Sequence, residues 1–245
     1  MTTQNPADKV SPAQAFDDEA PAPEEAARYA LLQRLAPALQ HHMMGQFQSM
    51  GMIAAMMEKR LESNEPDMAN IRRDCAALGS VSQTAINSII NLMTWIEPKP
   101  GLTVTVDAGV KECVSLLATQ FRFKGFAIVN EVPPLDLVVS SAGFRSVLSA
   151  TLIVLSDLSQ APADLVIQAQ AVPSGVELSI GLRATERSQK SLHSAPCRLM
   201  KWRDVEVLAA AETVRLTHGA DAARLAFTEA CEDLDPRLAN RARNR

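Results

Sequence analysis

The sequence predicts an α+β protein in which a helical hairpin precedes a sandwich of one sheet and its covering helices. Two observations lead to this fold class. Apolar residues repeat at steps of three and four over two long stretches before residue 98, and strand-like alternation begins after Gly101. Hydrophobic residues make up 47% of the 245 residues, which suffices for a packed core. The formal net charge of −4 argues against general binding to nucleic acid or to an anionic membrane.

Both ends of the chain are expected to lie outside the folded domains. Residues 1–23 hold four prolines and an acidic run at 17–19, and they lack the long apolar segment of a secretory signal, a pattern typical of a disordered leader. Residues 231–245 form an arginine-rich tail. The four cysteines show neither CxxC nor zinc spacing, so we expect reduced thiols in a cytoplasmic protein and no bound metal.

Residues 24–97 predict two long helices joined by a turn at 63–67, which makes an antiparallel hairpin. Pro37 should kink the first helix or mark its second start. The apolar seam of the first helix consists of Leu32, Leu35, Leu39, Met43, Phe47, Met50, Ala54, Met57 and Leu61. The repeat on the second helix, with its strict steps of four and three, consists of Ile71, Cys75, Leu78, Ser82, Ala85, Ile89, Leu92 and Ile96.

Both helices contain a long stretch without charged side chains. Residues 35–57 and 75–96 contain no Asp, Glu, Lys or Arg. Such stretches are long enough to span a bilayer, but the Gln, Asn, Ser, Thr and His residues throughout them argue against a membrane. Burial on more than one side explains the pattern better. We therefore predict that two hairpins form a four-helix-bundle homodimer, with a monomer of uncharged polar surface as the alternative.

Residues 101–230 predict the order strand, helix, two strands, helix, two strands, loop, helix and strand. The expected strands span residues 102–106, 126–132, 137–139, 165–167, 176–180 and 222–228. One expected helix spans 107–124, the next begins at Ser141, and the last spans 204–218 with Gly219 as its C-cap. Helices that fall between runs of strand without strict alternation indicate an α+β sandwich with its helices on one face of the sheet.

This order of elements resembles the core of sensor histidine kinases, in which a dimerisation and histidine-phosphotransfer hairpin precedes a Bergerat-type ATPase-like domain. The stretch HHMMGQFQSM at 41–50 is similar to the phospho-acceptor segment of that family if His41 takes the acceptor place. The helical pattern also favours His41, because this residue is two positions from both Leu39 and Met43 of the seam and should point to solvent. His42 is the second candidate.

The residues around His41 include side chains expected to bind a partner and two positions that differ from the family. The side chains expected to bind a partner beside His41 are Gln40, Met44, Gln48 and Met52. The acidic residue that acts as general base in the family is replaced by His42, and the polar residue four positions after the acceptor is replaced by Gly45.

The same resemblance implies that the ATPase-like domain has lost the residues that bind a nucleotide. The magnesium-binding Asn of the family falls at Val154, a second Asn position at Ala150, and the Asp that reads adenine at Leu182. None of these side chains offers the oxygen ligand that a hard cation or an amino group needs. The stretch from Trp202 that should hold the phosphate-binding glycine pair has no glycine before Gly219. We therefore expect no cofactor.

The function that the resemblance implies is that of a dimeric histidine phosphotransferase. It would relay a phosphoryl group between receiver-domain Asp residues through His41, without ATP. The alternative is a non-catalytic pseudo-histidine-kinase that regulates a receiver or a kinase by docking. An active autophosphorylating kinase is disfavoured by Val154 and Leu182. The expected partners are response-regulator receiver domains and a second copy of this chain, and neither nucleic acid nor a membrane is expected.

Overall fold

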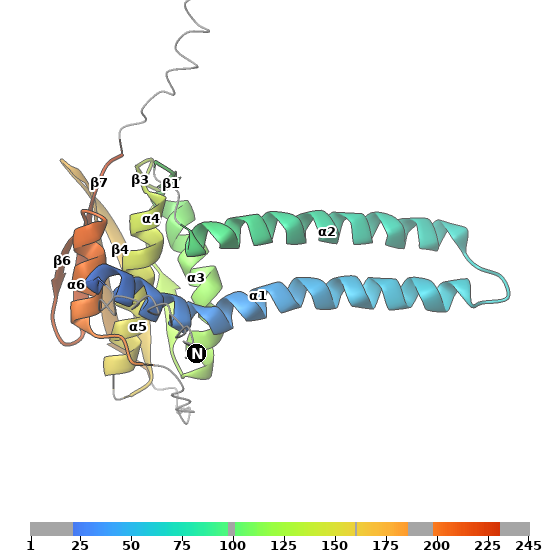
Figure 1. The fold of residues 1–245 in the computed structure, drawn as a ribbon, viewed down its shortest axis with the longest axis horizontal. Helices are drawn as coiled ribbons and strands as arrows, with labels where there is room; N and C mark the ends of the chain where they lie inside the picture. Colours follow the sequence, from blue (N-terminus) through green and yellow to red (C-terminus); the bar gives the residue numbers. More distant parts are fainter. Residues whose placement is uncertain (1–21, 98–100, 160, 186–197, 231–245) are drawn as a thin grey trace, which may run out of the picture.

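A long two-helix arm projects from one side of an α/β sandwich (Figure 1). The structure is a computed structural model that describes residues 22–97, 101–159, 161–185 and 198–230. The expected tail lies outside the described residues, and so does the expected leader apart from Ala22 and Pro23.

The hairpin consists of α1 (Pro23–Leu61) and α2 (Met68–Ile96). Pro37 lies inside α1, which continues through it as one helix and has no second start. At the beginning of α2, the Asp67 carboxylate accepts hydrogen bonds from the backbone N–H groups of the second and third following residues, at 3.0 and 3.1 Å. These bonds satisfy donors that the helix itself cannot pair.

The N-terminal part of α1 packs on the sandwich, a contact that the sequence analysis did not foresee. All the buried residues of α1 lie in this part, and they are Ala27, Ala30, Leu31, Arg34, Leu35, Ala38 and Leu39. They contact α3 (Val106–Phe123) and α6 (Trp202–Ala211) of the sandwich. Only the part of α1 after Leu39 pairs with α2 as a free-standing arm, which we call the stem (Figure 1).

The sheet of the sandwich has five strands in the order β2-β4-β5-β7-β6, with β2 parallel to β4 and the other neighbours antiparallel. Its strands are β2 (Ala127–Asn130), β4 (Ala163–Val172), β5 (Gly175–Ala184), β6 (Arg215–His218) and β7 (Ala222–Thr228). A separate small ladder joins β1 (Thr103–Thr105) to β3 (Val138–Ser140) in antiparallel register. The expected strands are therefore present, and β4 and β5 form one long hairpin.

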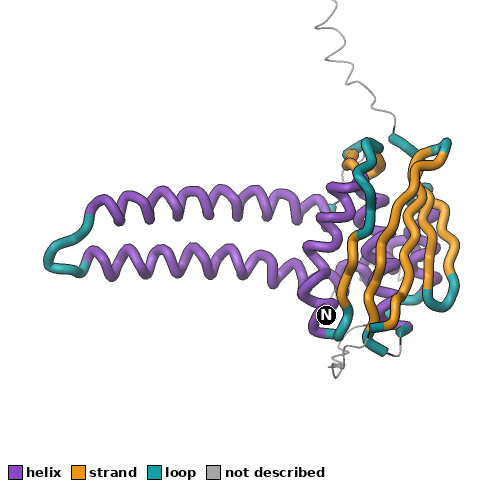
Figure 2. Tube along the Cα trace, turned by 180° about the vertical axis from the view of Figure 1, so that it is seen from behind, coloured by secondary structure: helices purple, strands orange, loops and turns teal. Residues whose placement is uncertain are grey.

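Helices cover one face of the sheet and leave the other open, as Figure 2 shows from the open side. The central helical stretch consists of α4 (Ser141–Gly143), a π-helical turn (Phe144–Leu148) and α5 (Ser149–Leu158). This stretch, 141–158, is apolar and long enough to cross a membrane, but 78% of it is buried inside the protein. It is the core helix of the sandwich, packed on the inward-facing side chains of β4 and β5.

The prediction of a helix over 204–218 is wrong in its second half. α6 ends at Ala211, and Thr213 adopts a left-handed conformation with φ 55°, which a continuing helix cannot contain. The chain then forms β6, in which Leu216 is half-buried and its neighbours are exposed. Gly219 does not cap a helix, because it lies in the β6–β7 turn and its N–H donates to the carbonyl oxygen of Ala222 at 2.8 Å.

Candidate functional site

His41 lies on α1 just beyond the point where the helix leaves the sandwich. It follows Arg34 by seven residues and Ala27 by fourteen, which is about two and four helical turns, so the three side chains share one side of the helix. Ala27 and Arg34 are buried against the sandwich, whereas His41 is exposed. The structure therefore places His41 on the sandwich-facing side of α1, immediately outside the sandwich.

His42 is exposed as well, and it lies about 100° around the helix from His41. It follows Leu35, which is buried, by seven residues and so lies on the side of α1 that carries Leu35. Within the described part of the chain, neither imidazole makes a hydrogen bond to another residue. Both rings are thus accessible to a partner, and they differ in the side of α1 that they occupy.

The side chains expected to bind a partner all lie at the surface of the stem. Gln40 and Gln48 are exposed, as are Met44 (47%) and Met52 (63%). Successive members are four residues apart, so they form a continuous strip along α1 past His41. Large apolar side chains in water beside an accessible imidazole are suited to contact another protein.

The seam expected on α1 divides into two rows in the structure. Met43, Met50 and Met57 are half-buried, and the first of them packs against the core. Phe47 (46%) and Leu61 (54%) are exposed in the single hairpin, and the expected dimer is what would bury them. The two rows differ in exposure because one partner helix covers only a narrow part of the surface of α1. The row of apolar residues is wider than the part that α2 covers.

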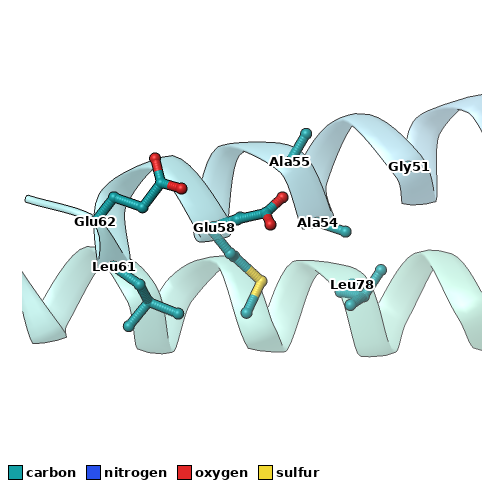
Figure 3. Close-up of a pocket in the computed structure, with 8 residues that line it drawn as sticks. Gly51, Ala54, Ala55, Glu58, Leu61, Glu62 and Leu78 are labelled. Atoms are coloured by element: carbon teal, nitrogen blue, oxygen red, sulfur yellow. The ribbon is translucent and has the colours of Figure 1, made fainter.

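The exposed row borders a shallow groove between the two helices of the stem, lined by small and apolar residues together with Glu58 and Glu62 of α1. The groove has a volume of about 800 Å³. Figure 3 shows Ala54 of α1 near Leu78 of α2, with Glu58, Leu61 and Glu62 further along α1. Along α2, the exposed fractions of Ile86, Ile90 and Met93 are 51%, 61% and 49%. Both helices of the stem therefore carry apolar side chains that one hairpin leaves in water.

A buried ion-pair cluster holds α1 on the sandwich. The Asp157 carboxylate oxygen Oδ1 accepts from Arg34 Nη2 at 2.7 Å and from Lys124 Nζ at 2.9 Å. The side chains of Arg34 and Asp157 are 7% and 5% exposed. This junction was not predicted from the sequence, although a lone Arg within the apolar face of a helix is a signal for a buried partner.

A second polar junction holds α2 on the sandwich. The Arg145 guanidinium, on the π-helical turn, donates to both Glu112 carboxylate oxygens at 2.8 and 3.1 Å and lies 5.5 Å from the centre of the Trp95 ring. It also donates to Asn91 Oδ1 at 2.9 Å. Because the two junctions fix α1 and α2 separately, the position of His41 relative to the sandwich is set by the fold.

The positions that the resemblance assigns to a nucleotide lie in the apolar core. Ala150 and Val154 are fully buried, and they share one side of α5 with Asp157, the residue that binds Arg34 of α1. Leu182 is half-buried on β5 and packs against the core. In the ranges that the structure describes, no group of three His, Cys, Asp or Glu residues could hold a metal ion.

His218, which the sequence placed at a helix end, lies on β6. Its ring stacks on Trp202 with centroids 4.2 Å apart, and its Nε2 lies 3.0 Å from Glu206 Oε1. These contacts with α6 give His218 a structural role at the edge of the sheet.

Solved structures of similar fold include parts of histidine kinases. The mycobacterial sensor histidine kinase MprB is 14% identical over 52% of this chain and 98% of its own, with a TM-score of 0.40. The histidine kinase ThkA, solved in complex with the response regulator protein TrrA, is 12% identical over 85% of this chain and 65% of its own, with a TM-score of 0.41. A bacterial phosphotransferase is 10% identical over 80% and 94%, with a TM-score of 0.38. No protein-family model and no curated protein matches the sequence.

Proposed function

We propose that the protein is a histidine phosphotransfer protein of two-component signalling, with His41 as the phosphoryl acceptor. The observation that carries this proposal is the position of His41, an unpartnered and exposed imidazole on the sandwich-facing side of α1, just outside the sandwich. An imidazole that relays phosphoryl groups has to be open to large partners and held in a fixed place, and the two polar junctions supply the fixed place.

The transfer needs only chemistry that an imidazole and an aspartyl phosphate supply. The lone pair of a neutral His41 ring nitrogen attacks the phosphorus of the donor's aspartyl phosphate. An N–P bond forms, the P–O bond breaks, and the donor leaves as a carboxylate. The reverse steps pass the phosphoryl group to the carboxylate of a second receiver domain, so the relay consumes no nucleotide.

The stem favours a homodimer as the working form. Phe47, Ala54 and Leu61 repeat at intervals of seven on α1, and the last two line the groove, whose carboxylates at Glu58 and Glu62 lie at its end near the turn. A second stem packed on this face would remove these side chains from water and complete a four-helix bundle. His41 lies on a different side of α1, so dimerisation leaves it accessible.

The burial of Ala150 and Val154 supports a relay without ATP. Neither side chain has an oxygen that could bind a cation, and α1 is held against the same side of α5 through Arg34. A nucleotide at this place would need polar ligands and open space. Phosphoryl groups would therefore come from a phosphorylated protein.

A docking protein without phosphotransfer is the second candidate, because the exposed strip on α1 could bind a partner whatever the role of His41. The two candidates separate in one experiment. Receiver domains charged with acetyl phosphate are incubated with the wild-type protein and with the His41→Ala and His42→Ala variants, while transfer and binding are followed separately. The relay predicts that His41→Ala loses transfer but keeps binding, and that His42→Ala keeps both. Binding to every variant with no transfer to any would establish docking alone.

A further inference from the structure

The end of helix α3 carries the most exposed large apolar side chain among the described residues, Phe123, which is 67% exposed. Phe121 and Phe126 on either side of it are buried, so the neighbouring aromatic residues serve the core and Phe123 does not. No described aromatic ring stacks on it. About two thirds of the Phe123 side chain lies in water, so it adds little to the core, and aromatic side chains are enriched at protein–protein interfaces.

The ion-pair cluster at Asp157 places this end of α3 beside the His41 side of α1. Lys124 directly follows α3, and its Nζ shares the Asp157 Oδ1 atom with Arg34. His41 lies about two turns, or about 10 Å, further along α1 on the same side as Arg34. The shared ion pair therefore places the end of α3 next to the side of α1 that carries Arg34 and, two turns on, His41, and we call the corner between them the angle.

The charges in this angle favour an acidic partner. Asp157 is buried and is shared by Arg34 and Lys124, which leaves one positive charge in excess at the cluster. Arg122, next to Phe123, is exposed and makes no ion pair with any described residue. A receiver domain must bring an aspartate, and the carboxylates around it, to the His41 imidazole, so its approaching face is negative.

We propose that the donor receiver domain docks in the angle between α1 and the end of α3, with Phe123 as its apolar anchor and Arg122 as its electrostatic guide. This inference rests on the proposed function. It assigns the sandwich a direct role in partner binding: the sandwich is the second wall of the docking site, and the exposed strip on the stem is the first.

The test is a phosphotransfer titration with every receiver domain that labels the wild-type protein in an acetyl phosphate panel. Phe123→Ala is compared with Tyr29→Ala, an equally large aromatic residue that is 63% exposed on the part of α1 that packs on the sandwich. Phe123→Ala should raise the receiver concentration for half-maximal rate by about tenfold and leave the rate at saturation unchanged. Tyr29→Ala should leave both values as in the wild type. The melting temperatures of both variants are measured, because an exposed side chain should not alter folding.

Arg122→Glu gives an independent reading of the same surface. It should weaken receiver binding, and the weakening should shrink as salt concentration rises. Equal half-maximal concentrations for Phe123→Ala and the wild type would overturn the docking proposal and leave the relay intact. If Phe123→Ala transfers normally but shifts the monomer–dimer equilibrium, the surface belongs to a second copy and the proposal is wrong. If no receiver labels the wild-type protein, the relay itself fails, and the docking proposal fails with it.

Discussion

Arg34 and His41 occupy the same side of α1 about two turns apart, and the sandwich covers only Arg34. One helix thus serves two purposes on one side. Its first part is a buried component of the sandwich, and the same side then continues in solvent with an accessible imidazole. The buried part fixes the direction in which the imidazole is presented.

The ion-pair cluster at Asp157 should make a large contribution to stability. Asp157→Ala leaves the buried Arg34 guanidinium without a counter-charge, and we expect a loss of about 3 kcal/mol in the free energy of unfolding. Asp107→Ala is the matched control, because Asp107 pairs with Lys111 at the surface of α3 and should cost less than about 1 kcal/mol. Urea unfolding of both variants measures the difference. Equal losses would show that the cluster does not hold α1 on the sandwich.

The proposed homodimer depends on the exposed row of α1. Phe47→Glu would bury a carboxylate in the bundle, so the variant should be monomeric at concentrations at which the wild-type protein is a dimer. Met52→Glu places the same charge on another side of α1 and should stay dimeric. Light scattering coupled to size-exclusion chromatography gives the masses. A dimeric Phe47→Glu variant would contradict the assignment of this face to a second copy.

The two cysteines among the described residues should react very differently. Burial raises the pKa of Cys113 to about 12, because the thiolate loses its hydration, whereas Cys75 is exposed. At pH 8, iodoacetamide should modify Cys75 and spare Cys113 until the protein is unfolded. Peptide mass spectrometry reads the two sites separately, and rapid modification of Cys113 in the folded protein would show that its site opens readily.

The same thiol makes stability depend on alkaline pH. The pKa of Cys113 is higher in the folded protein than its ordinary value of 9.0, so the unfolded chain loses the proton first as pH rises. Below about pH 9 the Cys113 thiol should therefore not change the free energy of unfolding. Between about pH 9 and 12 it should lower the free energy of unfolding as pH rises. Cys113→Ala should remove this part of the pH dependence, which thermal melting across the alkaline range can follow.

Nucleotide binding should be absent whether or not magnesium is present. Ala150, Val154 and Leu182 offer no polar ligand, and the first two are inaccessible to solvent. Calorimetric titration with ATP and MgCl₂ should therefore give no binding heat. Micromolar affinity would contradict the relay without ATP and would favour a divergent kinase.

The local elements of this fold could be predicted because their signals are short-range. The strands expected over 165–167 and 176–180 are present within β4 and β5, which pair as an antiparallel hairpin around the turn at Pro173–Gly175. The helix expected over 204–218 failed because Val214 and Leu216 also fit a helical period, and only the left-handed Thr213 ends α6.

The packing of α1 on the sandwich could not be predicted in this way. The apolar pattern of α1 continues across Leu39 without a break, although the buried residues of this helix all lie at or before Leu39 and α1 contacts both the sandwich and α2. Periodicity reports which side of a helix is buried, and not which element covers it. Arg34 was the available clue, since a charged residue among Leu31, Leu35 and Ala38 requires a buried counter-charge.

The most direct test of the account is to locate the phosphoryl group itself. The wild-type protein is charged by phosphorylated receiver domains, kept at neutral to alkaline pH, and digested for peptide mass spectrometry. We expect an acid-labile phosphoryl group on His41 and none on His42. A phosphoryl group on His42 alone, or no phosphohistidine after exposure to every charged receiver, would contradict it.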